Sequence, residues 1–203
     1  MKFKNLEMTG FKSFSEKTNI LIEKGLTGIV GPNGCGKSNI VEALRWCMGE
    51  NSAKSMRGSG MEDVIFSGTS NRPSKNISEV ALLLDNQEKS GPIQYKEFDE
   101  ISIKRKIEKD KGSKYYINDK EVRARDVQTF FADLSTGAHS PSLISQGRIG
   151  QLVTAKPIER KSILEEAAGI SGIHARRQEA ETRLNAAENN LKRADELKRQ
   201  QQK

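Results

Sequence analysis

Apolar residues in the first part of the chain alternate with polar ones or gather in short runs, a pattern typical of β-strands. Phe3, Leu6 and Met8 stand among polar residues, and compact apolar runs follow at 18–23 and 26–30. The last run leads directly into a glycine-rich stretch. We therefore predict three short strands within the first thirty residues, the third ending at that stretch.

A helical period begins just after the glycines. Apolar residues recur at 3.6-residue spacing from Ile40 to Met48, and Gly49 follows, which predicts an amphipathic helix ended by a C′ glycine. Glycine and serine are frequent in 52–72, where the periodicity weakens, so this region is predicted to be an ordered loop. The apolar run at 77–85 predicts another strand.

An alternating segment then predicts a β-hairpin. Ile101, Ile103 and Ile107 fall on one face of the first strand. Lys104 and Lys106 fall on the other face, and the chain turns at the sequence KDKGS. The outer face of this hairpin is therefore expected to be basic.

Helical patterns dominate the rest of the chain. They return at 122–134, and glycines in LISQGRIGQLV favour a loop near Gln146. Pro157 suits the first position of a long helix, with Thr154 nearby as a possible cap. Within this helix small and apolar residues repeat at 4-3-4-3 spacing, which indicates a coiled-coil seam: Ala180, Leu184, Ala187, Leu191 and Ala194. The alternative is a surface helix that packs on its own domain, since about two heptads are visible.

Length and composition fit one sizeable domain with an extended appendage. The chain has 203 residues, of which 34% are hydrophobic and 30% charged. The net charge of +7 is concentrated between Ile101 and Arg125, which suggests a phosphate-bearing polymer as a partner. Two cysteines make no disulfide framework, and neither an apolar leader nor a membrane-length run is present. We expect a cytoplasmic protein that does not contact membranes.

The sequence GPNGCGKS predicts a phosphate-binding loop. Gly31, Gly36, Lys37 and Ser38 satisfy the spacing G-x-x-x-x-G-K-[S/T] at every fixed position. Glycines let backbone N–H groups turn toward a β-phosphate, the lysine reaches the β and γ oxygens, and the serine hydroxyl binds Mg²⁺. Because a predicted strand precedes the loop and a helix follows it, we read it as a site for ATP and Mg²⁺.

A matching catalytic acid is harder to find. Hydrolysis needs an acid that holds the metal and a residue that positions water. Asp85 ends the apolar run VALLLDNQ, but no glutamate follows it, so a plain strand end at a turn is the better reading. The sequence DLSTGA at 133–138 lacks the paired glycines of an ABC signature and is read as a turn.

Six motifs in order resemble the N-terminal head segment of bacterial SMC (structural maintenance of chromosomes) proteins. They are GFKSF, GPNGCGKSNI, ALRWCMGE, MRGSGMEDVIFSG, SLISQGRI and RKSILEEAAGI, and the resemblance covers essentially the whole chain. It implies an α/β fold, the N-terminal lobe of an ABC-type P-loop head with a mixed β-sheet, followed by the start of a long coiled coil. The lobe would span 1–157 and the departing helix 158–203. The signature motif and the acidic Walker B residues would then lie in a separate C-terminal lobe.

The resemblance also implies roles for individual residues. The loop matching the Walker A motif would bind ATP through Pro32, Asn33, Gly34, Cys35, Gly36, Lys37, Ser38 and Asn39. Ser38 and the Q-loop Gln146 would hold Mg²⁺, and Arg57 would reach the nucleotide phosphates, so that Lys37, Gln146 and Arg57 serve catalysis. Lys12 and Ser13 match positions near the adenine and ribose.

DNA is the implied polymer. Arg123 and Arg125 match basic residues that face DNA held above engaged heads, and Lys104 and Lys106 would add to that surface. Two positions depart from the family: Gly60 replaces a frequent basic residue, and Cys35 replaces a small hydroxyl residue. The first departure weakens a DNA contact from its loop, whereas backbone-driven phosphate binding should tolerate the second.

The resemblance implies an ATPase subunit of a nucleoid-associated complex for chromosome condensation and partition. Two heads would form a homodimer around two ATP molecules, with sequence-independent DNA binding and a kleisin subunit near the coil after Ala168. Three alternatives remain: a related DNA-repair ATPase with a coiled coil, a nucleotide-binding module that never hydrolyses, and a DNA-binding module with an idle loop. EEAAGI and RGSGMEDVIF favour SMC over the repair ATPase.

Overall fold

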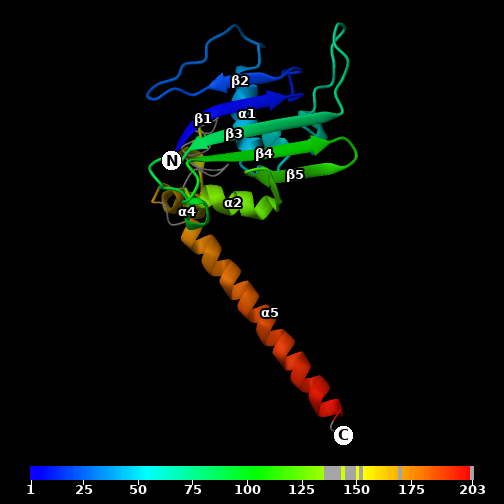
Figure 1. Cartoon of the computed structure of the whole chain (residues 1–203), viewed down its shortest axis with the longest axis vertical. Coiled ribbons are helices and arrows are strands. Elements are labelled where there is room, and N and C mark those ends of the chain that lie inside the picture. Colours follow the sequence, from blue (N-terminus) through cyan, green and yellow to red (C-terminus); the bar gives the residue numbers. More distant parts are fainter. Residues whose placement is uncertain (135–142, 145–149, 151–152, 169–170, 202–203) are drawn as a thin grey trace.

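A computed structural model describes residues 1–134, 143–144, 150, 153–168 and 171–201. A curved sheet with helices against one face forms the lobe, and a long helix leaves it as an arm (Figure 1). The strands are β1 (Lys2–Thr9), β2 (Thr18–Leu21), β3 (Ile77–Asp85), β4 (Glu100–Glu108), β5 (Gly112–Ile117) and β6 (Lys120–Val122). The helices are α1 (Lys37–Cys47), α2 (Ala124–Asp133), α4 (Pro157–Ala167) and α5 (Ser171–Gln201), with short 3₁₀ turns η1 (Lys54–Met56), η2 (Met61–Val64) and η3 (Ile93–Tyr95).

The sheet corrects the expected mixed topology. Its six strands run in the order β2-β1-β3-β4-β5-β6, and every pairing among these described strands is antiparallel. A parallel neighbour would have to come from the predicted strand at 26–30. Residues 22–30, all of which the structure describes, lie outside the strands and are mostly exposed. The prediction of a strand at 26–30 is therefore wrong for this chain taken alone, because a strand needs a partner edge.

Most other sequence predictions of local structure are confirmed. β1, β2, β3 and α1 occupy the predicted ranges, and Gly49 follows the C-cap of α1 with φ of 100°. β4 and β5 form the predicted hairpin. A helix begins at Pro157 as expected, but α4 ends at Ala167 and α5 begins at Ser171, so two helices stand where one long helix was predicted. The Thr154 hydroxyl donates to the Gly150 carbonyl, 3.0 Å away, and its role as a cap of α4 stays a prediction. The domain boundary at 157 stays a prediction.

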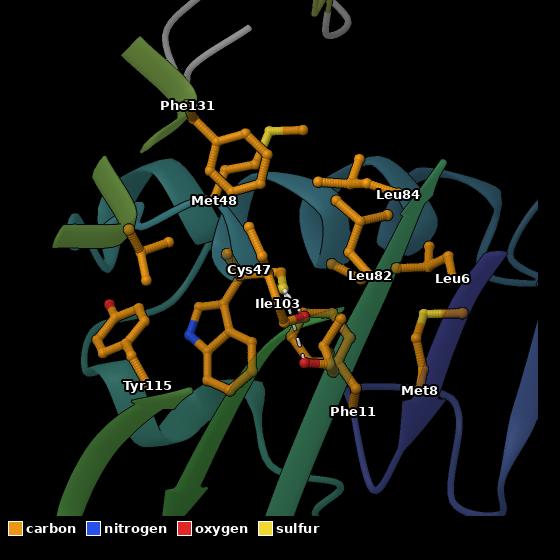
Figure 2. Close-up of a cluster of buried hydrophobic side chains, with 14 of the residues drawn as sticks. Leu6, Met8, Phe11, Cys47, Met48, Leu82, Leu84, Ile103, Tyr115 and Phe131 are labelled. Atoms are coloured by element: carbon orange, nitrogen blue, oxygen red, sulfur yellow. Dashed lines mark hydrogen bonds between the residues drawn. The ribbon is translucent and has the colours of Figure 1, made fainter. Parts of the chain in front are cut away.

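The core lies between the sheet and the α1 and α2 helices (Figure 2). Alternation along β3 and β4 turns Val80, Leu82, Ile101 and Ile103 toward these helices, and all are buried. Cys47 of α1 donates its thiol to the Ile103 carbonyl at 3.3 Å and to the Val80 carbonyl at 3.6 Å (Figure 2). Burial raises the pKa of Cys47 to about 12.

Arg105 is a charged residue on the apolar face of β4, where the sequence analysis named only isoleucines. It is 2% exposed and its guanidinium lies 4.5 Å from the Trp46 ring centroid and 4.6 Å from that of Tyr115. Nη1 donates to the carbonyls of Trp46 at 2.9 Å and Glu50 at 2.6 Å. Arg105 thus ties the C-terminal end of α1 to the hairpin, and burial lowers its pKa from the ordinary value.

The open face of the hairpin is of mixed charge, which corrects the expectation of a basic face. Lys104 Nζ lies 3.2 Å from Asp119 Oδ1 and 3.9 Å from Glu79 Oε1. Lys114 pairs with Glu121 at 3.2 Å. Glu79 comes from β3, Glu121 from β6 and Asp119 from the turn before β6, so the alternation within one strand could not reveal them.

The arm is the 31-residue helix α5, whose N-terminal part contacts α2. The predicted seam residues that the structure describes are exposed: Ala180, Leu184, Ala187, Leu191 and Ala194. Leu184 and Leu191 are 61% and 66% exposed. A surface helix packed on its own domain would bury this stripe, so the structure favours the coiled-coil reading. No described helix is long and apolar enough to cross a membrane.

Candidate nucleotide site

The glycine-rich loop places its backbone at the N-terminus of α1. Gly36 is the N-cap with φ of 94°, and Gly34 has φ of 83°, a left-handed conformation that L side chains rarely adopt. A Cβ on Gly36 would lie 2.5 Å from Ser13 Oγ. The helix opens with the sequence KSNI, which carries no acid. Backbone N–H groups at the start of the helix and the positive end of the helix dipole make this a site suited to a phosphate group.

Lys37 is the first residue of α1, and its side chain folds back onto the loop before the helix. Its ammonium donates to the carbonyls of Gly31 and Pro32, both at 2.5 Å, and lies 3.8 Å from Cys35 Sγ. Residues 31–35 are exposed, so a phosphate has access to the loop from solvent. A bound triphosphate would replace these two carbonyls as the hydrogen-bond acceptor of the Lys37 ammonium group.

Ser38 faces a cavity of about 260 Å³ on the side of α1. Arg57 lines the same cavity, which brings the expected magnesium ligand and the expected phosphate-sensing arginine together. Ile144, also at this cavity, comes two residues before the expected Q-loop glutamine. Gln146 itself lies outside the described residues.

Hydrogen bonds connect Arg57 to two more of the predicted residues, Asn39 and Ser13. Asn39 Nδ2 donates to Ser13 Oγ at 2.9 Å, and Arg57 Nη2 donates to Asn39 Oδ1 at 3.0 Å. Ser13 therefore lies against the loop, as expected of a residue near the nucleotide. Pro32, Asn33, Gly34 and Cys35 are exposed in the loop, and their contacts to a nucleotide stay predictions.

Glu42 is a site residue that the sequence analysis missed. Its carboxylate pairs with Arg57 Nε through Oε1 and with Lys12 Nζ through Oε2. A signal was present, because a residue four positions after Ser38 on a helix shares its face. Lys12 also donates to the Met56 carbonyl and its side chain is 14% exposed. Its expected place near adenine and ribose stays a prediction.

Asp63 shapes the loop that carries Arg57. Its Oδ2 accepts hydrogen bonds from Ser59 N at 2.6 Å, Gly60 N at 3.0 Å and Ser59 Oγ at 2.9 Å. The donors from Gly60 and Ser59 lower the pKa of Asp63. At neutral pH an ionised Asp63 thus fixes the backbone of the loop at Ser59 and Gly60.

Asp85 has a structural role at the end of β3. Its Oδ1 accepts a hydrogen bond from the Gln87 N–H at 2.9 Å, which is a side-chain-stabilised turn. This arrangement supports the reading of a plain strand end. Within the described part of the chain, no group of three or more metal-binding side chains gathers.

The expected DNA-binding residues fall into two places. Arg123 and Arg125 lie at the start of α2 and line a cavity of about 660 Å³ together with Lys120 and Arg183 of α5. Lys104 and Lys106 lie on the open face of the sheet, whereas α2 covers the opposite face. The structure therefore groups the two arginines but does not join the two lysines to them.

Comparison with known proteins places these features in a family. Residues 2–148 match the family of the RecF/RecN/SMC N-terminal domain. The chain belongs to this family. It is 57% identical over 197 residues to the chromosome partition protein Smc of Cereibacter sphaeroides, an alignment that covers 97% of this chain and 17% of that protein. The chain thus corresponds to the N-terminal head segment of a bacterial SMC protein and spans about one sixth of the length of such relatives.

Solved structures agree with this assignment. The Smc head domain of Pyrococcus furiosus with an extended coiled coil, bound to the C-terminal domain of ScpA, has a TM-score of 0.77 and 34% identity over 97% of this chain and 49% of that one. A second SMC ATPase structure, from work on ATP-driven dimerization and DNA-stimulated activation, has a TM-score of 0.70 and 33% identity over 82% and 99%. At this identity the SMC head segment shares both fold and family with them.

Proposed function

We propose that this chain is the ATP-binding N-terminal half of an SMC chromosome-partition ATPase head. The observation that carries the proposal is the phosphate-binding loop at the start of α1, with Ser38 and Arg57 at one cavity. Bound Mg²⁺ would neutralise charge on the phosphates, with Ser38 and Gln146 among its ligands. Lys37 would contact the β and γ oxygens, and the loop from Pro32 to Asn39 would hold the phosphates through backbone N–H groups.

A second lobe would complete the fold. Residues 26–30 enter the loop without a strand partner, and Leu26 and Val30 are 99% and 94% exposed. Exposed apolar side chains next to unpaired backbone groups mark an edge to which another strand adds. We infer that the C-terminal lobe supplies that strand and turns the predicted strand at 26–30 into an actual one.

Hydrolysis would require groups beyond this chain. The two acids that could hold the metal already have other partners: Asp85 stabilises a turn, and Glu42 at the Ser38 cavity pairs with Lys12 and Arg57. ATP would therefore be hydrolysed only in a composite site made with the C-terminal lobe and a second head. The similarity to an SMC ATPase that dimerises with ATP supports this part of the proposal.

DNA and a kleisin are the proposed partners of the assembled protein. The cavity at Arg123 and Arg125 is lined by four basic and three acidic side chains. Arginines there suit contacts to DNA phosphates, which act without regard to sequence and weaken with salt. The exposed seam on α5 calls for a second coiled-coil strand. The Smc head structures solved with ScpA support a kleisin subunit as a further partner.

The test is Mg-ATP binding measured by isothermal titration calorimetry. Lys37→Ile should weaken binding by at least about thirtyfold, the value of one charge-assisted contact to phosphate. Lys96→Ile, a change of the same type at an exposed loop lysine, should leave the affinity within about twofold. Equal affinities for both variants would contradict the proposal.

A further inference from the structure

Glu42 joins two separate loops to helix α1. It lies in the second turn of α1, and its side chain is 10% exposed. One carboxylate oxygen pairs with Lys12 from the turn after β1, and the other pairs with Arg57 from the loop after η1. Both oxygens of a largely buried carboxylate are therefore used, each by a cation from a different part of the chain.

The two cations reach Glu42 through unusual backbone conformations. Lys12 has φ of 47° and Arg57 has φ of 53°, values uncommon for residues other than glycine. Such conformations cost about 1 kcal/mol or more and persist where the surroundings fix them. Lys12 Nζ also donates to the carbonyl of Met56, the residue before Arg57. The two loops are thus fixed to each other as well as to Glu42.

Two nitrogens of the Arg57 guanidinium contact residues of α1, which leaves the rest of the group for other partners. Nε pairs with Glu42 and Nη2 donates to Asn39, and both partners lie on α1. The side chain nevertheless stays 57% exposed and lines the cavity that Ser38 also lines. A planar guanidinium held through two nitrogens has its plane fixed, so its remaining N–H groups point in one direction.

We propose that Glu42 is a positioning residue that orients Arg57 toward the nucleotide phosphates. This inference rests on the proposed function of the loop as an ATP site. The buried carboxylate offsets one of the two positive charges of Lys12 and Arg57 before nucleotide binds, and it fixes Arg57 in the direction that the phosphates would occupy. Without Glu42, Arg57 would keep its charge but lose its orientation, so that binding would have to order it first.

The experiment is a double-mutant cycle on Mg-ATP affinity, measured by calorimetry with wild type, Glu42→Gln, Arg57→Ala and the double variant. Glu42→Gln alone should weaken binding roughly fivefold to tenfold, close to the effect of Arg57→Ala, as expected where one residue acts through another. The double variant should be no weaker than Arg57→Ala. Glu97→Gln, the same change at an exposed loop residue, is the matched control and should have no effect.

A spectroscopic measurement separates orientation from general loss of structure. In ¹⁵N-arginine NMR spectra the Arg57 Hε signal should be distinct and slow to exchange in wild type, and it should collapse toward the solvent-exposed arginines in Glu42→Gln. Should Glu42→Gln unfold, Glu42→Asp keeps the charge with a shorter reach, and it should lose affinity partially in wild type but not in the Arg57→Ala background.

The outcomes are distinct. An unchanged affinity of Glu42→Gln, or losses that add in the double variant, would overturn the inference while leaving Lys37-dependent binding intact. Wild-type binding that Lys37→Ile does not weaken would overturn the proposed function, and the inference with it.

Discussion

Removing Arg105 should destabilise the lobe more than any exposed lysine of the same hairpin. Its guanidinium lies between Trp46 and Tyr115 and donates to backbone carbonyls at the end of α1. Replacing a buried ion pair by apolar residues can be neutral, because both charges are removed. Here the acceptors are backbone carbonyls, which no side-chain substitution removes, so the change leaves polar groups without their charged donor.

The magnitude follows from these contacts. Each hydrogen bond from a charged donor contributes about 1.5–3 kcal/mol, and the two ring contacts add about 1 kcal/mol each, while relief of the buried charge offsets part of the sum. We expect Arg105→Ala to lower the free energy of unfolding by about 4 kcal/mol and Arg105→Met by about 3 kcal/mol, since Met keeps the packing between the rings. Arg105→Lys keeps the charge but not the fork, and should cost about 2 kcal/mol.

The assay is urea unfolding followed by the fluorescence of Trp46, the single tryptophan of the chain, with circular dichroism as a second probe. Lys106→Ala, the next residue on the opposite face of β4, is the control and should change stability by less than about 0.5 kcal/mol. A loss below about 1 kcal/mol for Arg105→Ala would refute this reasoning, as would an Arg105→Met variant as stable as wild type.

Three further predictions follow from individual residues. Because the folded-state pKa of Cys47 is raised from 9.0 to about 12, its stabilisation is complete below pH 9 and is lost as pH rises toward 12. The free energy of unfolding should fall relative to Cys47→Ala by up to about 1.4 kcal/mol per pH unit in that window, and parallel pH profiles would exclude the effect. Mg-ATP should protect the exposed Cys35 from iodoacetamide, and equal labelling with and without nucleotide would argue against phosphate in the loop. Replacing Arg123 and Arg125 by alanine should reduce the salt dependence of DNA binding by about two ions, more than Lys104→Ala does, because Lys104 lies on the opposite face of the sheet from α2; an equal effect of Lys104→Ala would contradict this.

Local periodicity predicted most of the elements of the lobe. The alternation in β3 and β4 and the 3.6-residue spacing in α1 depend on nearby residues, and these elements formed where expected. The strand at 26–30 did not, because its apolar run has no neighbouring strand among the residues that the structure describes. A pattern can show that a segment suits a strand, but pairing depends on what lies beside it.

Contacts distant in sequence account for the other differences. Strand alternation alone would have placed Arg105 on the buried face, yet nothing local indicated that aromatic rings and carbonyls would hold it there. Strand alternation placed Lys104 on a basic face, but Glu79 and Asp119 lie beside it and pair with it. The motif predicted that Lys37 and Ser38 stand at the start of a helix, and they do. Glu42 belongs to no motif, and only its contacts with Lys12 and Arg57 connect it to the site.

The central claim is that this chain forms one side of a composite ATPase site. Steady-state ATP turnover tests it most directly, measured for the chain alone and after addition of the C-terminal lobe of the same protein. We expect no turnover by the chain alone, and turnover with the lobe that Lys37→Ile abolishes. Turnover by the chain alone that Asp85→Asn abolishes would contradict a composite site, because the catalytic acid would then lie at the end of β3.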